Sequence, residues 1–338
     1  MLISILQQHY GIQTKEQLMI GKYEACLEQN QLYLLVPVGN IDQDELKELE
    51  SLVNHFLHNG DKNVCEILKT KEDSLHAKVG EQFFCVLVAR NLKTTKNLQH
   101  LGRKLAKFHF RGRQVTFPVQ KIKRIGQWKQ FWEQRLNQME RVWTEKLFQP
   151  PENDFERMFL ESFPYYMGLS ENAIQYLVDT ELDDDPLVVD NGTVCHLKFH
   201  QKNWGDYYFL KNPFDWVFDH STRDVAEWIR ERYLWNSQTY QPELVQFMKD
   251  YQSIAPLSSF SWRLLYSRLL FPLHYYECIE GYYMATSEQH KNLLQDQLKK
   301  YLQQTSEHEQ FLARFFQLVE VPVKMNHIPS VEWLNKIR

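Results

Sequence analysis

The first ninety residues combine short apolar runs with one segment of helical spacing. In the segment between Asp42 and Gly60, apolar residues recur every three or four positions, which predicts a helix with a buried face. Asp42 and Glu45 have the spacing of a capping box at its start, and Gly60 is placed to end it. The β-prone apolar runs predict four strands, at 23–28, 32–38, 64–69 and 83–89.

After Arg90 the pattern changes to long helical runs with aromatic seams. The predicted helices are 95–111, 126–147, 152–167, 170–179, 222–235, 241–252, 260–284 and 287–318. Short strand-like runs interrupt them at 187–189 and 207–210. We therefore expect an α+β chain, with a small β-rich lobe over residues 1–92 and a large helical lobe over residues 93–338.

The composition fits a globular protein, with 43% hydrophobic and 24% charged residues. A net charge of −4 argues against specific nucleic-acid binding. The 5 cysteines are scattered without a CxxC pair, which is typical of a reducing compartment. No basic residue precedes Lys15, and no stretch reaches the roughly 18 apolar residues of a membrane span. We expect synthesis in the cytoplasm, with no signal peptide and no membrane span.

Charge is distributed unevenly along the chain. Residues 82–132 contain no Asp or Glu, whereas Lys and Arg are frequent between Arg90 and Lys129. Segment 90–129 is therefore a candidate surface for an acidic partner. The alternative is a solvated helical face whose charge is balanced by the acidic remainder of the chain.

The candidate chemistry lies between residues 194 and 230. His196, His200 and Asn203 have the spacing of the catalytic loop in phosphotransferases of the protein-kinase fold, H-x-D-x-x-x-x-N. In that loop the Asp accepts the proton of the substrate hydroxyl and the Asn binds magnesium. Position 198, where the Asp belongs, is Lys. An ammonium group cannot accept this proton at neutral pH and repels magnesium, so the loop is degenerate.

The residues downstream match the same fold in part. Asp224, in the run Arg-Asp-Val-Ala, corresponds to a structural Asp that opens a helix. The magnesium-binding carboxylate falls on Asn212 when the sequences are counted without a gap, and on Asp215 after a short deletion. Both assignments stay open, although Asn is the weaker magnesium ligand. Lys198 is a candidate to pair with Asp215 or Asp219, or it points to solvent.

Together with the stretches PFDWVFDHSTRDVAEWIRERY and FPYYMGLSENAIQYL, this pattern resembles the spore-coat CotS family of kinase-like proteins. That family belongs to the aminoglycoside-phosphotransferase/choline-kinase superfamily, and the resemblance covers nearly the whole chain. It implies a two-lobed, aminoglycoside-phosphotransferase-type fold. It also implies synthesis in the mother cell, a place in the bacterial endospore coat, and other coat proteins as partners.

Two further parts of a kinase site are missing from the sequence. No Lys or Arg occurs between Lys22 and Lys47, so the predicted strand 32–38, which takes the place of the third strand of a kinase, lacks the cation that holds the phosphates. Glu45 or Glu48 stands where the partner of that cation is expected. We therefore predict a pseudokinase with no catalytic residues. The alternative is an atypical small-molecule phosphotransferase that uses ATP and magnesium through Asp215 or Asp219.

No cofactor is expected for a pseudokinase. The degenerate metal and nucleotide positions are Asn203, Asn212, Asp215 and Asp219. A separate metal centre is not expected either, because Cys195, His196 and His200 do not supply the four ligands of a structural site.

Overall fold

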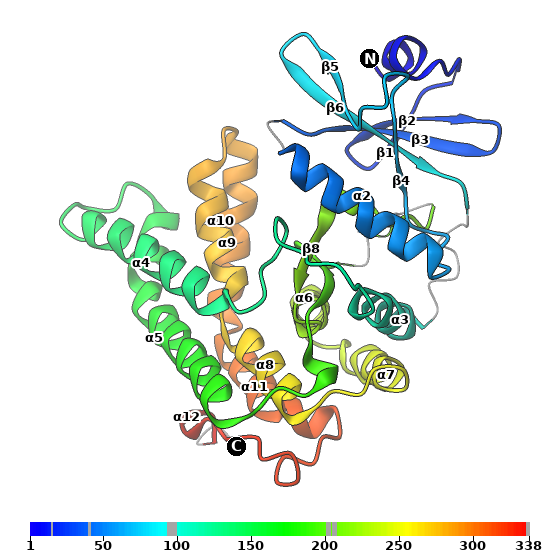
Figure 1. Ribbon diagram of the computed structural model, residues 1–338. Helices are drawn as coiled ribbons and strands as arrows, with labels where there is room; N and C mark the ends of the chain where they lie inside the picture. Colours follow the sequence, from blue (N-terminus) through cyan, green and yellow to red (C-terminus); the bar gives the residue numbers. More distant parts are fainter. Residues whose placement is uncertain (15, 40–41, 93–99, 201–203, 205–207, 336–338) are drawn as a thin grey trace. The chain divides into compact units, whose positions relative to one another are not determined.

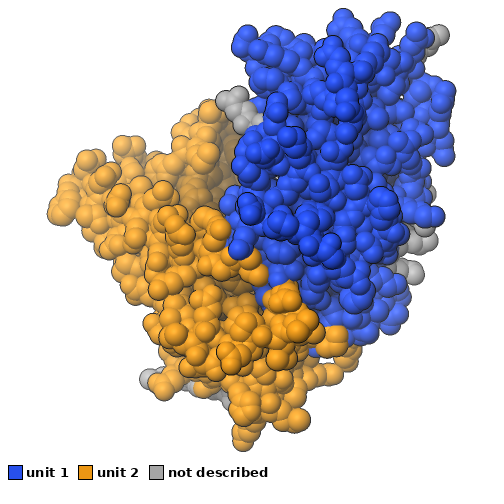
Figure 2. All heavy atoms as spheres, in the orientation of Figure 1, with its two compact units in different colours: residues 1–124, 192–228, 250–255 blue, residues 125–191, 229–249, 256–338 orange. Residues whose placement is uncertain are grey.

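The computed structural model describes all residues except 15, 40–41, 93–99, 201–203, 205–207 and 336–338 (Figure 1). The chain forms two compact units, coloured separately in Figure 2. Unit 1 contains residues 1–124, 192–228 and 250–255, and unit 2 contains residues 125–191, 229–249 and 256–338. This division follows internal contacts and differs from the lobe boundary near residue 92, which stays a prediction.

Unit 1 contains an antiparallel sheet with strand order β1-β2-β3-β6-β4, in which β5 also pairs with β6. Its strands are β1 (Leu18–Ile20), β2 (Tyr23–Glu28), β3 (Gln31–Pro37), β4 (Glu66–Leu68), β5 (Ala77–Val79) and β6 (Gln82–Ala89). Four of them confirm the predicted strands within a few residues. The sequence did not reveal β1 and β5, which have 3 residues each and are too short for a clear alternation.

Helices and a small second sheet complete unit 1. The N-terminal α1 (Leu2–Ile5) continues into a π-helical turn, and its apolar residues join the core against the sheet. Helix α2 (Gln43–His58) is the predicted helix after Asp42, whose side chain accepts a hydrogen bond from the backbone nitrogen of Asp44 at 3.0 Å. The remaining elements are α3 (Leu101–Arg113), a 3-10 turn (Pro213–Asp215), and the paired strands β7 (Thr193–His196) and β8 (Trp216–Asp219).

The contact between α3 and β7 is close because Gly112 has no side chain. A Cβ at this position would lie 2.7 Å from the backbone nitrogen of Val194 and would also collide with Oγ1 of Thr193. Thr193 uses that hydroxyl to donate to the carbonyl of His109 at 2.7 Å. A glycine on α3 thus lets the strand that leads into the degenerate loop pack directly on the helix.

Unit 2 is helical. Its elements are α4 (Trp128–Lys146), α5 (Asp154–Asp183), α8 (Ser259–Leu270), α9 (Leu273–Met284), α10 (Glu288–Gln303), α11 (Thr305–Leu318) and α12 (Glu332–Asn335). Helices α6 (Thr222–Trp235) and α7 (Gln241–Gln252) contribute residues to both units. Their bounds match the predicted helices 222–235 and 241–252.

Four predictions for unit 2 were wrong. The runs 152–167 and 170–179 form the single helix α5, which contains Pro164 internally. The run 260–284 is divided between α8 and α9 by Pro272, because proline cannot continue the helical hydrogen bonds. The strand-like run 187–189 lies in a 3-10 turn (Val188–Asp190), in which the Asp190 carboxylate accepts from the backbone nitrogen of Leu187.

The predicted helix 287–318 is also two helices. The first, α10, ends at Gln303, and α11 begins at Thr305. None of the helices in the described part of the chain has the length and apolar character needed to cross a bilayer.

Candidate functional site

The degenerate loop begins where β7 ends. His196 pairs with Trp216 in the register of β7 and β8. One residue further along, the backbone nitrogen of Leu197 donates to the carbonyl of Asp215 at 2.8 Å. This bond extends the two-stranded ladder and places the main chain of Asp215 beside the turn that carries Lys198.

Asp224, on the first turn of α6, fixes the start of this loop. Its carboxylate is fully buried and accepts from the backbone nitrogen of His196 at 2.9 Å and from Nδ1 of the same ring at 2.7 Å. The opposite ring nitrogen, Nε2, accepts from the indole nitrogen of Trp204 at 3.0 Å. The His196 proton therefore resides on Nδ1, and the imidazole is held by hydrogen bonds at both nitrogens.

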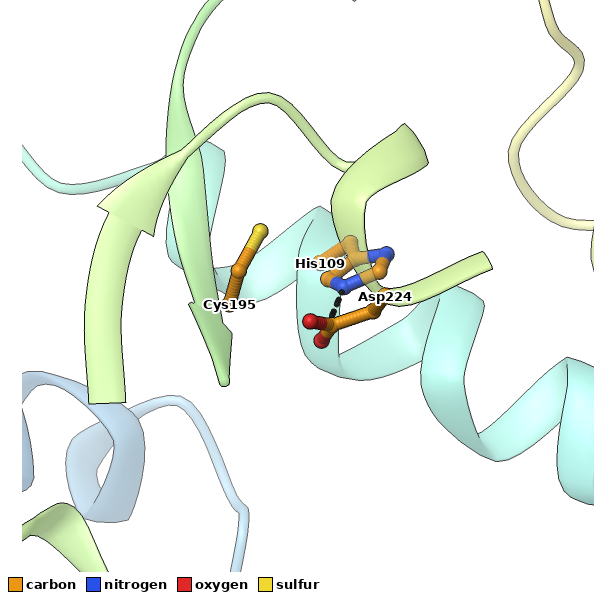
Figure 3. Close-up of side chains that lie close together, drawn as sticks. All are labelled: His109, Cys195 and Asp224. Atoms are coloured by element: carbon orange, nitrogen blue, oxygen red, sulfur yellow. Dashed lines mark hydrogen bonds and ion pairs between the residues drawn. The ribbon is translucent and has the colours of Figure 1, made fainter. Parts of the chain in front are cut away.

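His109 on α3 is the second partner of Asp224 (Figure 3). Its Nε2 lies 3.1 Å from the carboxylate and its Nδ1 lies 2.8 Å from the hydroxyl of Tyr251. Burial lowers the pKa of His109 to about 4, although Asp224 favours the charged ring. Burial alone would raise the pKa of Asp224, but the interactions with His196 and His109 outweigh it and hold that pKa well below its ordinary value.

Cys195 completes a buried group with His109 and Asp224 whose donor atoms lie within 4.8 Å of one another. These donors are already used by the protein. The thiol of Cys195 points to the carbonyls of His220 and Asp219 at 3.4 and 3.7 Å, and burial raises its pKa well above the ordinary value. Because a metal requires the thiolate, this group fits a hydrogen-bonded core better than a metal site.

Arg223 supplies a cation to Asp219, the last residue of β8. Its guanidinium donates to the buried Asp219 carboxylate at 2.8 Å. The same group donates to the carbonyls of His196 at 2.9 Å and Leu197 at 2.8 Å. Arg223 therefore braces the turn before Lys198 and neutralises Asp219 from α6. Lys198 itself is exposed.

The two candidates for the magnesium position have different surroundings. The Asn212 amide is engaged at both ends: Oδ1 accepts from the backbone nitrogen of Phe214 at 3.0 Å, and Nδ2 donates to the Tyr23 hydroxyl at 3.2 Å. The half-buried Asp215 carboxylate makes no hydrogen bond or ion pair with the described residues. Burial raises the pKa of Asp215, and the nearby His196 and Lys22 counteract this effect.

The two remaining predicted residues of the loop are Asn203 and His200. Asn203 lies outside the described residues. His200 is half-buried after the Lys198 turn. The structure thus brings together His196, Asp215, Asp219 and Asp224 around the β7–β8 ladder.

The phosphate-anchoring pair of an active kinase has no counterpart on β3 and α2. Strand β3 contains no cation. Glu48 on α2 accepts from the backbone nitrogens of Gln120 at 2.6 Å and Lys121 at 3.0 Å, and also from Ile122 at 3.1 Å. This carboxylate holds the loop after α3, a role that the sequence did not suggest.

Sequence reasoning also missed a buried ion pair beside the loop. Lys211, with 3% of its side chain exposed, donates to the carboxylate of Asp61 at 2.6 Å. Its ammonium lies 4.8 Å from the ring centre of Phe108 and 4.7 Å from that of Trp204. Burial lowers the pKa of Lys211, while Asp61 opposes the change. The partners are 150 positions apart, so no local pattern could have revealed the pair.

The basic segment 90–129 is partly neutralised inside unit 1. Several of its cations form ion pairs with carboxylates of that unit: Arg90 with Glu66, Arg103 with Asp250, Arg111 with Asp61, and Lys121 with Asp42. These pairs favour the balanced-charge interpretation over a dedicated acidic-partner surface.

Comparison with known proteins assigns the chain to a family. Residues 3–315 match the family model described as "Spore coat putative kinase YutH". The chain belongs to the YutH spore-coat family. A relative in Bacillus subtilis (strain 168), the endospore coat-associated protein YutH, is 39% identical over 337 residues, which cover 99% of both chains.

Solved structures share the fold of this YutH-family chain at low sequence identity. An aminoglycoside phosphotransferase from Alicyclobacillus acidocaldarius has a TM-score of 0.68 at 15% identity, covering 90% of this chain and 92% of that one. A microcompartment-associated aminopropanol kinase has a TM-score of 0.60 at 12% identity, covering 94% and 98%. The predicted aminoglycoside-phosphotransferase-type, kinase-like fold is thus confirmed.

Proposed function

We propose that this chain is a catalytically inactive, kinase-fold component of the bacterial endospore coat. It is made in the mother cell and acts through contacts with other coat proteins. The coat-associated relative and the family match support this location. The observation that carries the inactive assignment is the exposed Lys198 at the position of the catalytic base.

The surroundings of Lys198 add to this argument. Magnesium bound to ATP needs carboxylates that are free to bind it, but Asp219 is already paired with Arg223. With no cation on β3 and Glu48 bound to backbone nitrogens, the residues present fit ATP and magnesium poorly. We therefore expect no cofactor. Loss of both the base and the phosphate-binding charges removes most of the stabilisation that phosphoryl transfer requires.

The second candidate function is an atypical small-molecule phosphotransferase. One observation favours it: Asp215 lies at the end of the β7–β8 ladder, half-buried and without an ion pair among the described residues, near the charge of Lys22. We infer from this placement that Asp215, rather than Asn212, occupies the magnesium position.

Nucleotide binding separates the two functions. The melting temperature is measured with and without ATP and magnesium, for the natural chain and for Asp215→Asn, with the exposed Asp185→Asn as control. The inactive assignment predicts no rise for any of them, because only a ligand that binds the folded state stabilises it. A rise that Asp215→Asn alone removes, accompanied by ATP turnover, would establish the phosphotransferase instead.

Restoring an Asp at position 198 is a second test of the catalytically inactive assignment. Lys198→Asp should remain without ATP turnover, because the cation that anchors the phosphates is still missing from β3. Turnover by this variant would contradict the claim that the site has lost more than its base. The coat location is tested separately, by imaging a fluorescent fusion in sporulating cells. A fusion that stays in the mother-cell cytoplasm would contradict it.

A further inference from the structure

The turn between α4 and α5 presents an apolar surface to solvent. Residues 147–154 are all exposed. Phe148, which is 86% exposed, is the most exposed aromatic residue in the described part of the chain. Its neighbour Leu147 is 45% exposed. Pro150 and Pro151 follow and stiffen the turn. Residues 147–152 form the α4–α5 knob.

Unit 2 also contains a large cavity, the α11 cavity, of about 1060 Å³. Its aromatic walls are formed by Tyr233, Tyr240, Tyr266, Phe311 and Phe316. Tyr233 is 4% exposed, and its hydroxyl has no hydrogen-bond partner among the described residues. A buried hydroxyl without a partner is costly, so this atom marks the place where a ligand can accept a hydrogen bond.

The knob and the cavity lie toward opposite ends of α5. The knob precedes Asp154, the first residue of this helix. Near the other end, the Tyr176 hydroxyl donates to the carbonyl of Pro329, which lines the cavity. At 1.5 Å per residue, these two positions on α5 are about 33 Å apart. Figure 1 shows the same arrangement, with the α4–α5 turn at one end of α5 and α12 at the other. A chain therefore cannot place its knob in its own cavity.

We infer that the α4–α5 knob of one copy docks in the α11 cavity of a second copy. The chemistry of the two surfaces matches. Proline-containing segments bind aromatic-lined grooves, where the ring faces pack on the prolines. The carbonyls of such segments make no internal hydrogen bonds and can therefore accept from hydroxyl groups of the groove. Phe148 and Pro150 supply the apolar groups, and a knob carbonyl accepts from the Tyr233 hydroxyl.

Charge fixes the orientation of the docked knob. Two exposed side chains of opposite sign, Glu307 and Arg314, line the cavity from α11. They are two helical turns apart and so share one face of that helix. The exposed Glu152 at the end of the knob pairs with Arg314 and is repelled by Glu307.

This contact joins different surfaces of the two copies. Because one such contact leaves one knob and one cavity unoccupied in the pair, the head-to-tail contact can repeat and builds chains or closed rings of molecules. The inference does not depend on the state of the kinase-like site, whose residues belong to unit 1.

Size measurements on the full chain test the contact. Light scattering after size-exclusion chromatography should show a mass that grows with concentration for the natural chain. The first variant, Phe148→Ser, removes the aromatic side chain of the knob. The second variant combines Gln310→Trp with Gln317→Trp, two exposed positions that line the cavity, and fills its mouth. Each should weaken association at least tenfold. The control is Met284→Ser, an equally exposed apolar residue outside both surfaces.

Mixing the two variants gives the decisive result. The knob variant retains its cavity and the cavity variant retains its knob, so an equimolar mixture should form dimers and nothing larger. A natural chain that stays monomeric at hundreds of micromolar overturns the inference. So does association that depends on Phe148 but not on the cavity, because it would indicate a knob-to-knob dimer. Circular dichroism of each variant verifies that it is folded.

Discussion

The carboxylate of Asp224 receives hydrogen bonds from both the backbone nitrogen and the ring Nδ1 of His196, at 2.9 and 2.7 Å. One buried side chain at the start of α6 thus fixes the main chain and the imidazole at the end of β7. The arrangement holds the first residue of the kinase-like loop in place whatever residue stands at position 198.

Replacing Asp224 should therefore be costly. Asp224→Asn keeps the size of the side chain but places an amide N–H among the backbone nitrogen and Nδ1 of His196 and Nε2 of His109. It also removes the negative charge that these three groups contact. We expect a loss of about 3 kcal/mol in the free energy of unfolding, measured with urea. The exposed Asp185→Asn should change it by less than about 0.5 kcal/mol. Equal stabilities of the two variants would contradict this role.

Acidification should destabilise the fold through His109. Burial lowers its pKa from 6.5 to about 4, so below pH 6.5 the unfolded chain takes up a proton that the folded chain does not. Stability from this ring is complete above pH 6.5 and falls as the pH decreases toward 4, by ~3 kcal/mol in all. His109→Gln should flatten the dependence of unfolding free energy on pH by about 1.4 kcal/mol per unit between pH 6 and 4.5. The exposed His290→Gln should leave the slope unchanged.

Gly112 on α3 and Gly168 on α5 should respond oppositely to alanine. Gly112→Ala forces a Cβ against Val194 and Thr193, and we expect a loss of about 2 kcal/mol. At Gly168, on α5, nothing lies within 4 Å of the added Cβ, so Gly168→Ala should stabilise the helix by about 0.5–1 kcal/mol. Thermal unfolding of both variants checks the pair. A stable Gly112→Ala protein would show that α3 and β7 are not in close contact.

The buried cation of Lys211 gives a fourth prediction. Lys211→Met leaves Asp61 with the Arg111 contact at 3.2 Å and should cost about 3 kcal/mol. Removing both charges, with Asp61→Asn added, should recover part of that loss because no buried charge then lacks its partner. Lys107→Met, at an exposed position on α3, is the matched control. Chemical denaturation of the natural chain and these three variants tests whether the loss comes from leaving a buried charge without its partner.

The sequence predicted the elements whose signals are local. Asp42 marked the start of α2, and the β-prone apolar runs located β2, β3 and β6. It failed where a single residue breaks a continuous pattern, as Pro272 does between α8 and α9, or where proline is tolerated, as Pro164 is within α5.

The candidate site shows the same limit. The spacing of His196 and Asp224 pointed to the kinase-like loop, because that motif is contained within thirty positions. Its bracing by Arg223 was not predicted, since Lys198 looked like the available cation for Asp219. The contacts of Glu48 and Lys211 join segments far apart in the chain, and only the fold brings them together.

Arg223 has a consequence for how such a loop changes over evolution. Its guanidinium holds two main-chain carbonyls and one carboxylate, using only protein atoms. A turn anchored in this way keeps its shape without an ion to organise it. Substitutions at position 198 are then not penalised through misfolding, so the same turn accommodates an acidic residue or a residue of opposite charge.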